Sequence, residues 1–143
     1  MPFILEIKGL LNIVALEKSI NTIIERHEIL RTNFSSIDGK PTQIINKDIN
    51  FKLSIDDLRN KKETQANKIV NQFTERPFDL AKGLLFSVKL LQLDTKVYWL
   101  IFNIHHIIFD GWFYEIKQKE LFTLYKAYGQ EKIPELGQIP IQY

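Results

Sequence analysis

The sequence predicts an α+β fold, and three observations support this. Segments in which apolar and polar residues alternate, the pattern typical of strands, occur near the N-terminus and again in the second half of the chain. Longer segments with apolar residues every three or four positions, typical of helices, lie between them. The predicted strands include hairpins and no regular strand–helix repeat, so we expect a mixed sheet with helices packed on it.

The expected strands have period-two patterns or runs of β-branched and aromatic residues: Phe3–Lys8, Leu30–Ile37, Thr42–Asn46, Phe51–Ile55, Leu84–Leu93 and Lys96–His105. Tight turns are expected at Asp38-Gly39 and Asp94-Thr95. The expected helices are Ile13–Glu28 with Asn12 as N-cap, Arg59–Glu75 stopped by Pro77, and Trp112–Tyr128 ended by Gly129. Ile133–Tyr143 contains two prolines and one glycine, which predict an irregular tail.

Composition narrows the class of protein. The chain has 143 residues, 45% of them hydrophobic, which suits one domain with a packed core. Its 19 Lys plus Arg are scattered and nearly balanced by 17 Asp plus Glu, which argues against a nucleic-acid partner. The absence of cysteine excludes disulfides and thiolate chemistry. No Gly-rich phosphate loop follows a strand, so a nucleotide site has no support.

Membrane association is not expected either. No apolar run approaches the roughly 18 residues of a membrane span. The N-terminus has no basic region before its apolar stretch, and Glu6 interrupts that stretch early, so no signal peptide is expected. The sequence predicts a cytoplasmic protein without a membrane partner.

One segment, Asn103–Gly111, carries the candidate chemistry. His105 and His106 end the most apolar strand of the chain, and Asp110 and Gly111 precede a helix. Neighbouring residues on a strand point to opposite faces. We therefore expect one imidazole to act on a substrate and the other to form internal hydrogen bonds.

On spacing alone, other interpretations stay open. Histidines on an apolar strand are often satisfied core residues. Two histidines and a carboxylate can hold a metal ion, although the opposed faces of His105 and His106 argue against a shared metal. Asp110 fits either a general acid or base or a structural ion-pair partner, and Gly111 fits a simple turn before a helix.

The segment resembles a family signature. His105–Gly111 is similar to the HHxxxDG motif of nonribosomal peptide synthetase condensation domains, which belong to the chloramphenicol acetyltransferase-like superfamily. Three further matches occur in the family's order: Arg26–Phe34 resembles RHExLRTxF, Pro77–Leu80 with Gly83–Phe86 resembles the PFDL segment, and Leu136–Tyr143 resembles the run after the first lobe. Several acyltransferase families share HHxxxD, but four matches over nearly the whole chain make the resemblance specific.

The resemblance implies one chloramphenicol acetyltransferase-like lobe. Residues 1–143 would be the N-terminal lobe of a condensation domain whose C-terminal lobe is absent. In the family, upstream and downstream peptidyl carrier domains present phosphopantetheine arms to a tunnel between the two lobes. The implied partners are these carriers and the missing lobe, and the implied site binds no cofactor of its own and no metal.

The resemblance also implies roles for the site residues. His106 would face the tunnel, position the acceptor amine and relay its proton, with His105 as buried support. Gly111 would offer its backbone N–H to the developing oxyanion. Asp110 would pair with an upstream arginine, either Arg26 or Arg31. Breaking that pair should cost about 3–5 kcal/mol, so substitution of Asp110 should harm folding more than chemistry.

The expected function is peptide-bond formation between a carrier-bound acyl or peptidyl thioester and a carrier-bound aminoacyl amine in nonribosomal peptide synthesis. One alternative is a non-catalytic truncated lobe or carrier-docking fragment. Another is a related HHxxxDG epimerisation or acyltransferase domain. The match over Arg26–Phe34 favours condensation over the other acyltransferases.

Overall fold

The computed structural model describes residues 2–47, 49–105, 107, 111–129 and 135–139, with residues 2–3, 111–118 and 135–139 described by their backbone. A five-stranded sheet has the order β4-β5-β6-β1-β7, and β2 and β3 form a separate ribbon. The strands are β1 (Pro2–Lys8), β2 (Thr32–Ile37), β3 (Lys40–Ile45), β4 (Ser54–Asp57), β5 (Phe86–Asp94), β6 (Val97–Ile104) and β7 (Glu135–Ile139). The helices are α1 (Ile13–Arg26), α2 (Glu63–Thr74) and α3 (Gly111–Gly129).

The five-stranded sheet is mixed. β6 lies antiparallel to both β1 and β5, and β7 lies antiparallel to β1. β4 runs parallel to β5, which it reaches through the crossover containing α2. The predicted α+β fold with helices packed on a mixed sheet is confirmed.

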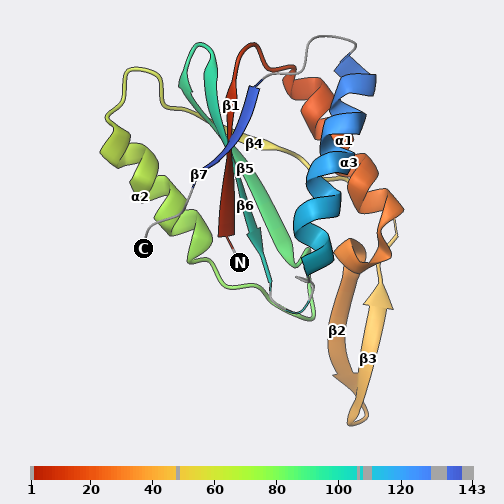
Figure 1. Ribbon diagram of the computed structural model, residues 1–143. Helices are drawn as coiled ribbons and strands as arrows, with labels where there is room; N and C mark the ends of the chain where they lie inside the picture. The colour runs from red at the N-terminus through yellow and green to blue at the C-terminus, as the bar shows by residue number, and fades with distance from the viewer. Residues whose placement is uncertain (1, 48, 106, 108–110, 130–134, 140–143) are drawn as a thin grey trace.

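Different helices cover the two faces of this sheet (Figure 1). α1 and α3 pack on one face and α2 packs on the other. Alternate residues of β6 therefore enter two cores: Tyr98, Leu100 and Ile104 face α1 and α3, whereas Trp99 and Ile101 face α2. Burial on both faces explains why this strand is apolar almost throughout. None of the described helices is both long and apolar enough to cross a membrane.

α1 begins as the sequence predicts. The side-chain oxygen of Asn12 accepts a hydrogen bond from Ala15 N at 3.0 Å, which satisfies one of the free N–H groups of the first turn. The buried face of the helix is formed by Ala15, Leu16, Ser19, Ile20, Ile23 and Ile24. The N-cap is confirmed. Of the predicted stripe, Leu16, Ile20, Ile23 and Ile24 are buried in the helix, whereas His27 lies beyond its end.

The end of α1 differs from the prediction. The helix stops at Arg26 because His27 has extended backbone angles, φ −121° and ψ 100°. A short 3-10 helix, Glu28–Arg31, follows, and β2 starts only at Thr32. The first two residues of the predicted strand Leu30–Ile37 were therefore assigned wrongly.

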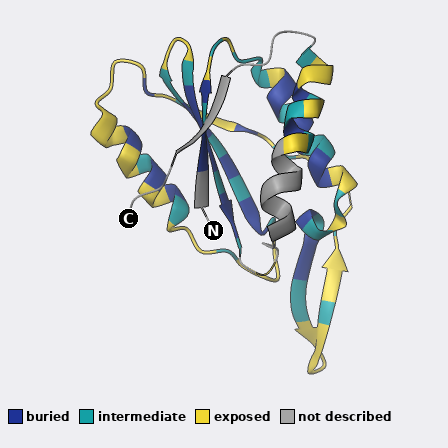
Figure 2. Ribbon diagram, viewed as in Figure 1, coloured by how far each residue is buried: buried dark blue, intermediate teal, exposed yellow. Residues whose placement is uncertain are grey.

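β2 and β3 form a ribbon that extends away from the rest of the molecule (Figures 1 and 2). The predicted turn at Asp38-Gly39 is confirmed, since both residues have positive φ, 52° and 78°. Two positive φ angles are what the favoured two-residue hairpin turn requires. Most of β3 is exposed, and it spans Lys40–Ile45 rather than the predicted Thr42–Asn46.

The predicted strand Phe51–Ile55 is shifted along the chain. Phe51 N donates to Asn21 Oδ1 and Leu53 N donates to Glu17 Oε2, each at 2.8 Å. Both acceptors are side chains of α1, so this part of the backbone is held by a helix and not by a strand. The strand β4 begins only at Ser54.

α2 is shorter than the predicted helix Arg59–Glu75. Asn60 has a positive φ of 69° and lies in a turn, so the helix begins at Glu63. The apolar period predicts that Ala66, Ile69, Val70 and Phe73 face inward; Ala66, Val70 and Phe73 are buried, and Ile69 is half-buried. The last carbonyls of α2, on Phe73 and Thr74, accept hydrogen bonds from the buried Asn103 side chain of β6.

The prediction of an irregular tail at Ile133–Tyr143 is wrong in part. Residues Glu135–Ile139 form β7, which pairs with β1 over Ile4–Lys8. Pro134 and Pro140 lie just outside the strand, so the five residues between them keep their N–H groups for pairing. The prolines therefore bound a strand instead of preventing one.

This pairing predicts unequal effects of proline at two adjacent positions of β7. N–H groups of neighbouring residues on a strand point to opposite edges, so only one of Leu136 and Gly137 directs its N–H at β1. We expect one of Leu136→Pro and Gly137→Pro to lower the free energy of unfolding by about 2–4 kcal/mol, through a lost ladder bond and an unpaired carbonyl. Denaturant unfolding of both variants measures this, and equal losses would contradict the register.

A second prediction concerns pH. Arg59 donates hydrogen bonds to both oxygens of Asp57, which lower the pKa of this exposed carboxyl from 3.8 to about 2. A lowered pKa in the folded state stabilises the fold above pH 4, and this stabilisation is lost as pH falls towards 2. Asp57→Asn should lower the melting temperature slightly at pH 6, and the difference from the parent should vanish near pH 2. A difference that grows in acid would contradict this.

Candidate active site

His105 lies directly after β6 and is held by its own backbone and by its ring. Its N–H donates to Leu85 O at 2.8 Å, which extends the pairing of β6 with β5 by one residue. Its Nδ1 accepts a hydrogen bond from Ile107 N at 3.0 Å. In the neutral ring the proton is therefore on Nε2. We predicted a buried side chain at His105, but it is only half-buried. It does make the internal hydrogen bond that we expect of the histidine that does not act on the substrate.

The Pro77–Leu80 and Gly83–Phe86 segments, which resemble the family's PFDL segment, both contact His105. The ring of Phe78, in Pro77–Leu80, contacts the His105 imidazole edge-on, with centroids 6.0 Å apart and planes at 67°. Leu85, in Gly83–Phe86, accepts the His105 backbone bond. The two segments are thus packed against the start of the HHxxxDG motif.

The segment Arg26–Phe34 joins this assembly through Asn33. The buried Asn33 amide donates to Leu80 O at 3.2 Å and to Gly83 O at 2.7 Å. Its oxygen accepts from the Asn46 amide at 2.5 Å, and Phe34 N donates to Leu80 O. Residues 33–34, Asn46 and residues 80–83 are therefore bonded together beside the candidate site.

Arg31 has a structural role in the described part of the chain. Its guanidinium donates to Ile24 O and Glu25 O in the last turn of α1, and to Asn46 O after β3, at 2.9–3.0 Å. These bonds satisfy carbonyls that the helix end leaves free. Arg31 thus fixes the end of α1 to the hairpin.

Arg26 pairs with Glu120 of α3, a residue that the sequence interpretation missed. Arg26 Nη1 lies 2.6 Å from Glu120 Oε1, but not in hydrogen-bond alignment. His27 Nε2 lies 2.7 Å from Oε2 of the same carboxylate, whose side chain is only 11% exposed. The sequence does contain a sign of this buried carboxylate. Glu120 lies four residues after Ile116 and four before Leu124, on the apolar stripe of the predicted helix.

Of the remaining candidate residues, the structure describes Gly111 only. His106 and Asp110 lie outside the described residues, so the direction of the His106 ring and the pairing of Asp110 with Arg26 or Arg31 stay predictions. Gly111 is the first residue of α3. Its N–H is therefore one of the first-turn groups that have no hydrogen-bond acceptor within the helix. Within the described ranges no three His, Asp or Glu side chains form a group able to hold a metal ion.

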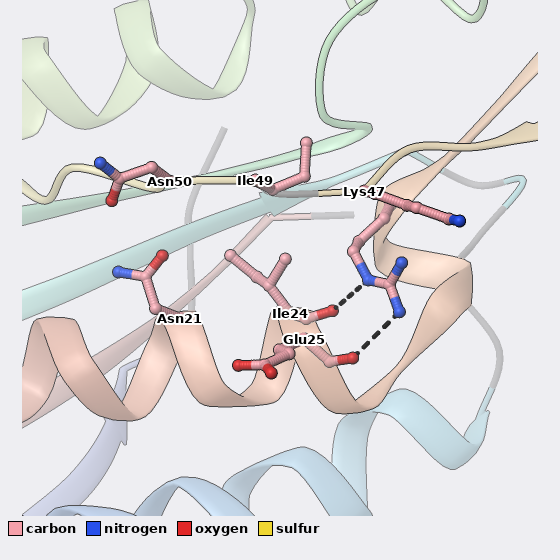
Figure 3. A pocket seen from close by; sticks show the side chains of 7 residues that line it. Asn21, Ile24, Glu25, Lys47, Ile49 and Asn50 are labelled. Atoms are coloured by element: carbon pink, nitrogen blue, oxygen red, sulfur yellow. Dashed lines mark hydrogen bonds between the residues drawn. The ribbon is translucent and has the colours of Figure 1, made fainter.

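A separate hollow of about 630 Å³ lies between α1 and the segment after β3 (Figure 3). It is lined by Asn21, Ile24, Glu25, Arg31, Lys47, Ile49 and Asn50. The side chains of Asn21 and Arg31 already bind backbone groups of the protein, and the dashed lines in Figure 3 mark two of these bonds. Neither His105 nor Gly111, the described ends of the HHxxxDG segment, is among the described residues that line it, so we do not assign it to the candidate site.

Comparison with known proteins identifies the family. The profile of the family described as Condensation domain matches residues 1–143, the whole chain. Gramicidin S synthase 2 of Aneurinibacillus migulanus is 41% identical over 143 residues, and bacitracin synthase 2 of Bacillus licheniformis is 38% identical over 143. Each alignment covers 100% of this chain, which spans only 3% of the gramicidin S synthase and 5% of the bacitracin synthase.

Solved structures agree on the fold. The X-domain from teicoplanin biosynthesis superposes with a TM-score of 0.83 at 25% identity, over 94% of this chain and 29% of that one. The starter condensation domain of rhizomide synthetase gives 0.83 at 21% identity, over 93% and 33%. The fold and motif thus define the chloramphenicol acetyltransferase-like class. Within that class, the chain belongs to the condensation-domain family of nonribosomal peptide synthetases.

Proposed function

We propose that this chain contributes the HHxxxDG lobe to a condensation domain that forms amide bonds between carrier-bound substrates. One observation carries the proposal. Segments that resemble three family motifs, around Asn33, Phe78 and His105, are bonded or packed together at the end of β6, where the signature begins.

The proposed reaction needs no metal or nucleotide because a thioester is already activated. The acceptor amine attacks the thioester carbonyl, and a tetrahedral oxyanion forms. Its collapse makes the amide bond, breaks the carbon–sulfur bond and releases the carrier thiol, which receives the proton lost by the amine. We assign His106 to positioning the amine and relaying that proton, and the Gly111 N–H to the oxyanion.

The proposal includes the partners. Upstream and downstream carrier domains would present the substrates on phosphopantetheine arms, and a C-terminal lobe would complete the tunnel. The solved condensation-type chains support this second lobe, since the present chain covers only about a third of them. The proposed location is the cytoplasm.

The proposal is tested with the complete condensation domain that contains this chain. It is mixed with one carrier bearing an aminoacyl thioester as donor and a second bearing an aminoacyl acceptor. We expect a dipeptide on the acceptor carrier, detected as a mass increase of one aminoacyl residue. Inversion of the aminoacyl centre without transfer would indicate epimerisation instead.

The alternative to catalysis is that the chain binds a partner protein without transferring a substrate. The teicoplanin X-domain, 26% identical to this chain, has been solved as a complex with OxyB. Stable binding of a partner protein with no transfer under any substrate pairing would place the present chain in such a role.

A further inference from the structure

α1 and α3 are antiparallel neighbours joined by polar bonds at both ends of their contact. At the end of α3, Tyr125 Oη accepts from Asn12 N at 2.8 Å, and Gly129 lies against Ala15. Towards its start, Glu120 binds the last residue of α1 and the one after it, Arg26 and His27. Glu120 is thus the described polar contact of α3 that lies nearest to the HHxxxDG segment.

Such polar contacts fix where a helix lies along its axis. The apolar contacts of α3, through Leu121 and Leu124, depend on buried area and are not directional. A hydrogen bond tolerates only a few tenths of an ångström. The His27–Glu120 contact at 2.7 Å therefore restricts axial movement of α3 more tightly than the apolar packing does.

A shift of Glu120 along the axis of α3 also moves the end of the HHxxxDG segment. Gly111 is both the last residue of the HHxxxDG segment and the first of α3. The ten residues from Gly111 to Glu120 form about 14 Å of continuous helix, so a shift at Glu120 reaches Gly111 almost undiminished. A misplacement of about 1 Å at a reacting centre can cost 10²-fold in rate.

We propose that Glu120 is a positioning residue, which acts through α3 to set where Gly111 lies. Arg26 and His27 hold Glu120 in place. The segment that resembles RHExLRTxF therefore positions the HHxxxDG segment through Glu120 as well as through the contacts of Asn33. This inference rests on the proposed function and adds to it a residue outside both motifs.

The test uses the complete condensation domain and its loaded carriers, at a temperature where all variants are folded. Glu120→Ala should lower kcat at least about tenfold and leave the KM for each carrier substrate within about twofold. Glu120→Gln keeps an oxygen acceptor for His27 and should retain an intermediate kcat. Asp57→Asn, which removes a carboxylate–arginine pair at the sheet edge, is the matched control and should leave kcat unchanged.

The outcomes separate this inference from the proposed function. Unchanged kcat in both Glu120 variants, with only a lower melting temperature, would overturn the positioning role, as would a rise in KM with kcat unchanged. His106→Ala serves as the reference. If the parent domain forms no dipeptide, the proposed function fails; if His106→Ala transfers at the parent rate, the role assigned to His106 fails. If His106→Ala is inactive and the Glu120 variants are fully active, only the present inference fails.

Discussion

His106→Ala is expected to lower the rate of peptide transfer by about 10²–10⁴-fold, the range that a positioned acid or base contributes. The variant should melt close to the parent, because the removed imidazole is assigned to the substrate and not to the fold. Single-turnover transfer between loaded carriers measures the chemical step, and thermal melting of the same sample checks the fold.

His105→Ala is the matched comparison. Loss of its Nδ1 leaves the Ile107 N–H, at an exposed position, without its present acceptor, which should cost about 0.5–1.5 kcal/mol of stability. Transfer should fall by less than about tenfold, since we assign this ring to holding the turn and not to the substrate. The reverse pattern, with His105 essential and His106 dispensable, would exchange the two roles and refute the proposed mechanism.

The elements best predicted from the sequence are those whose apolar pattern is repeated over many residues. β5, β6 and α1 each bury a regular set of side chains, so their existence follows from periodicity alone. The errors occur where a distant group decides the local structure. Glu17 and Asn21 hold residues 51–53 against α1, and the open edge of β1 gives residues 135–139 a strand to pair with.

The candidate site shows the same division. The HHxxxDG segment is contiguous, so its residues are recognisable in the sequence, and the structure confirms that His105 makes an internal hydrogen bond. Glu120 is 93 residues from His27, and only the packing of α3 on α1 brings them together. Asn33 was included in a motif, but its contact with residues 80–83 depends on the fold as a whole.

Asn33→Ala is expected to lower the free energy of unfolding by about 2–4 kcal/mol. The Asn33 side chain is buried and makes three hydrogen bonds, and its removal leaves Leu80 O, Gly83 O and the Asn46 amide each short of a partner. Each lost hydrogen bond costs about 0.5–1.5 kcal/mol, since Leu80 O keeps its bond from Phe34 N and the Asn46 amide keeps its bond to Arg31 O. Denaturant unfolding gives the loss directly.

The matched control is Asn50→Ala, because Asn50 is exposed and its side chain has no hydrogen-bond partner among the described residues. It should change stability by less than about 0.5 kcal/mol. Limited proteolysis adds a local readout. In the Asn33 variant the segment Asp79–Gly83 loses two of the bonds that hold it, so cleavage there should precede global unfolding. If the two variants proved equally stable and equally resistant, the Asn33 side chain would not be what ties these segments together, and the structural basis of the candidate site would have to lie in the contact between Phe78 and His105.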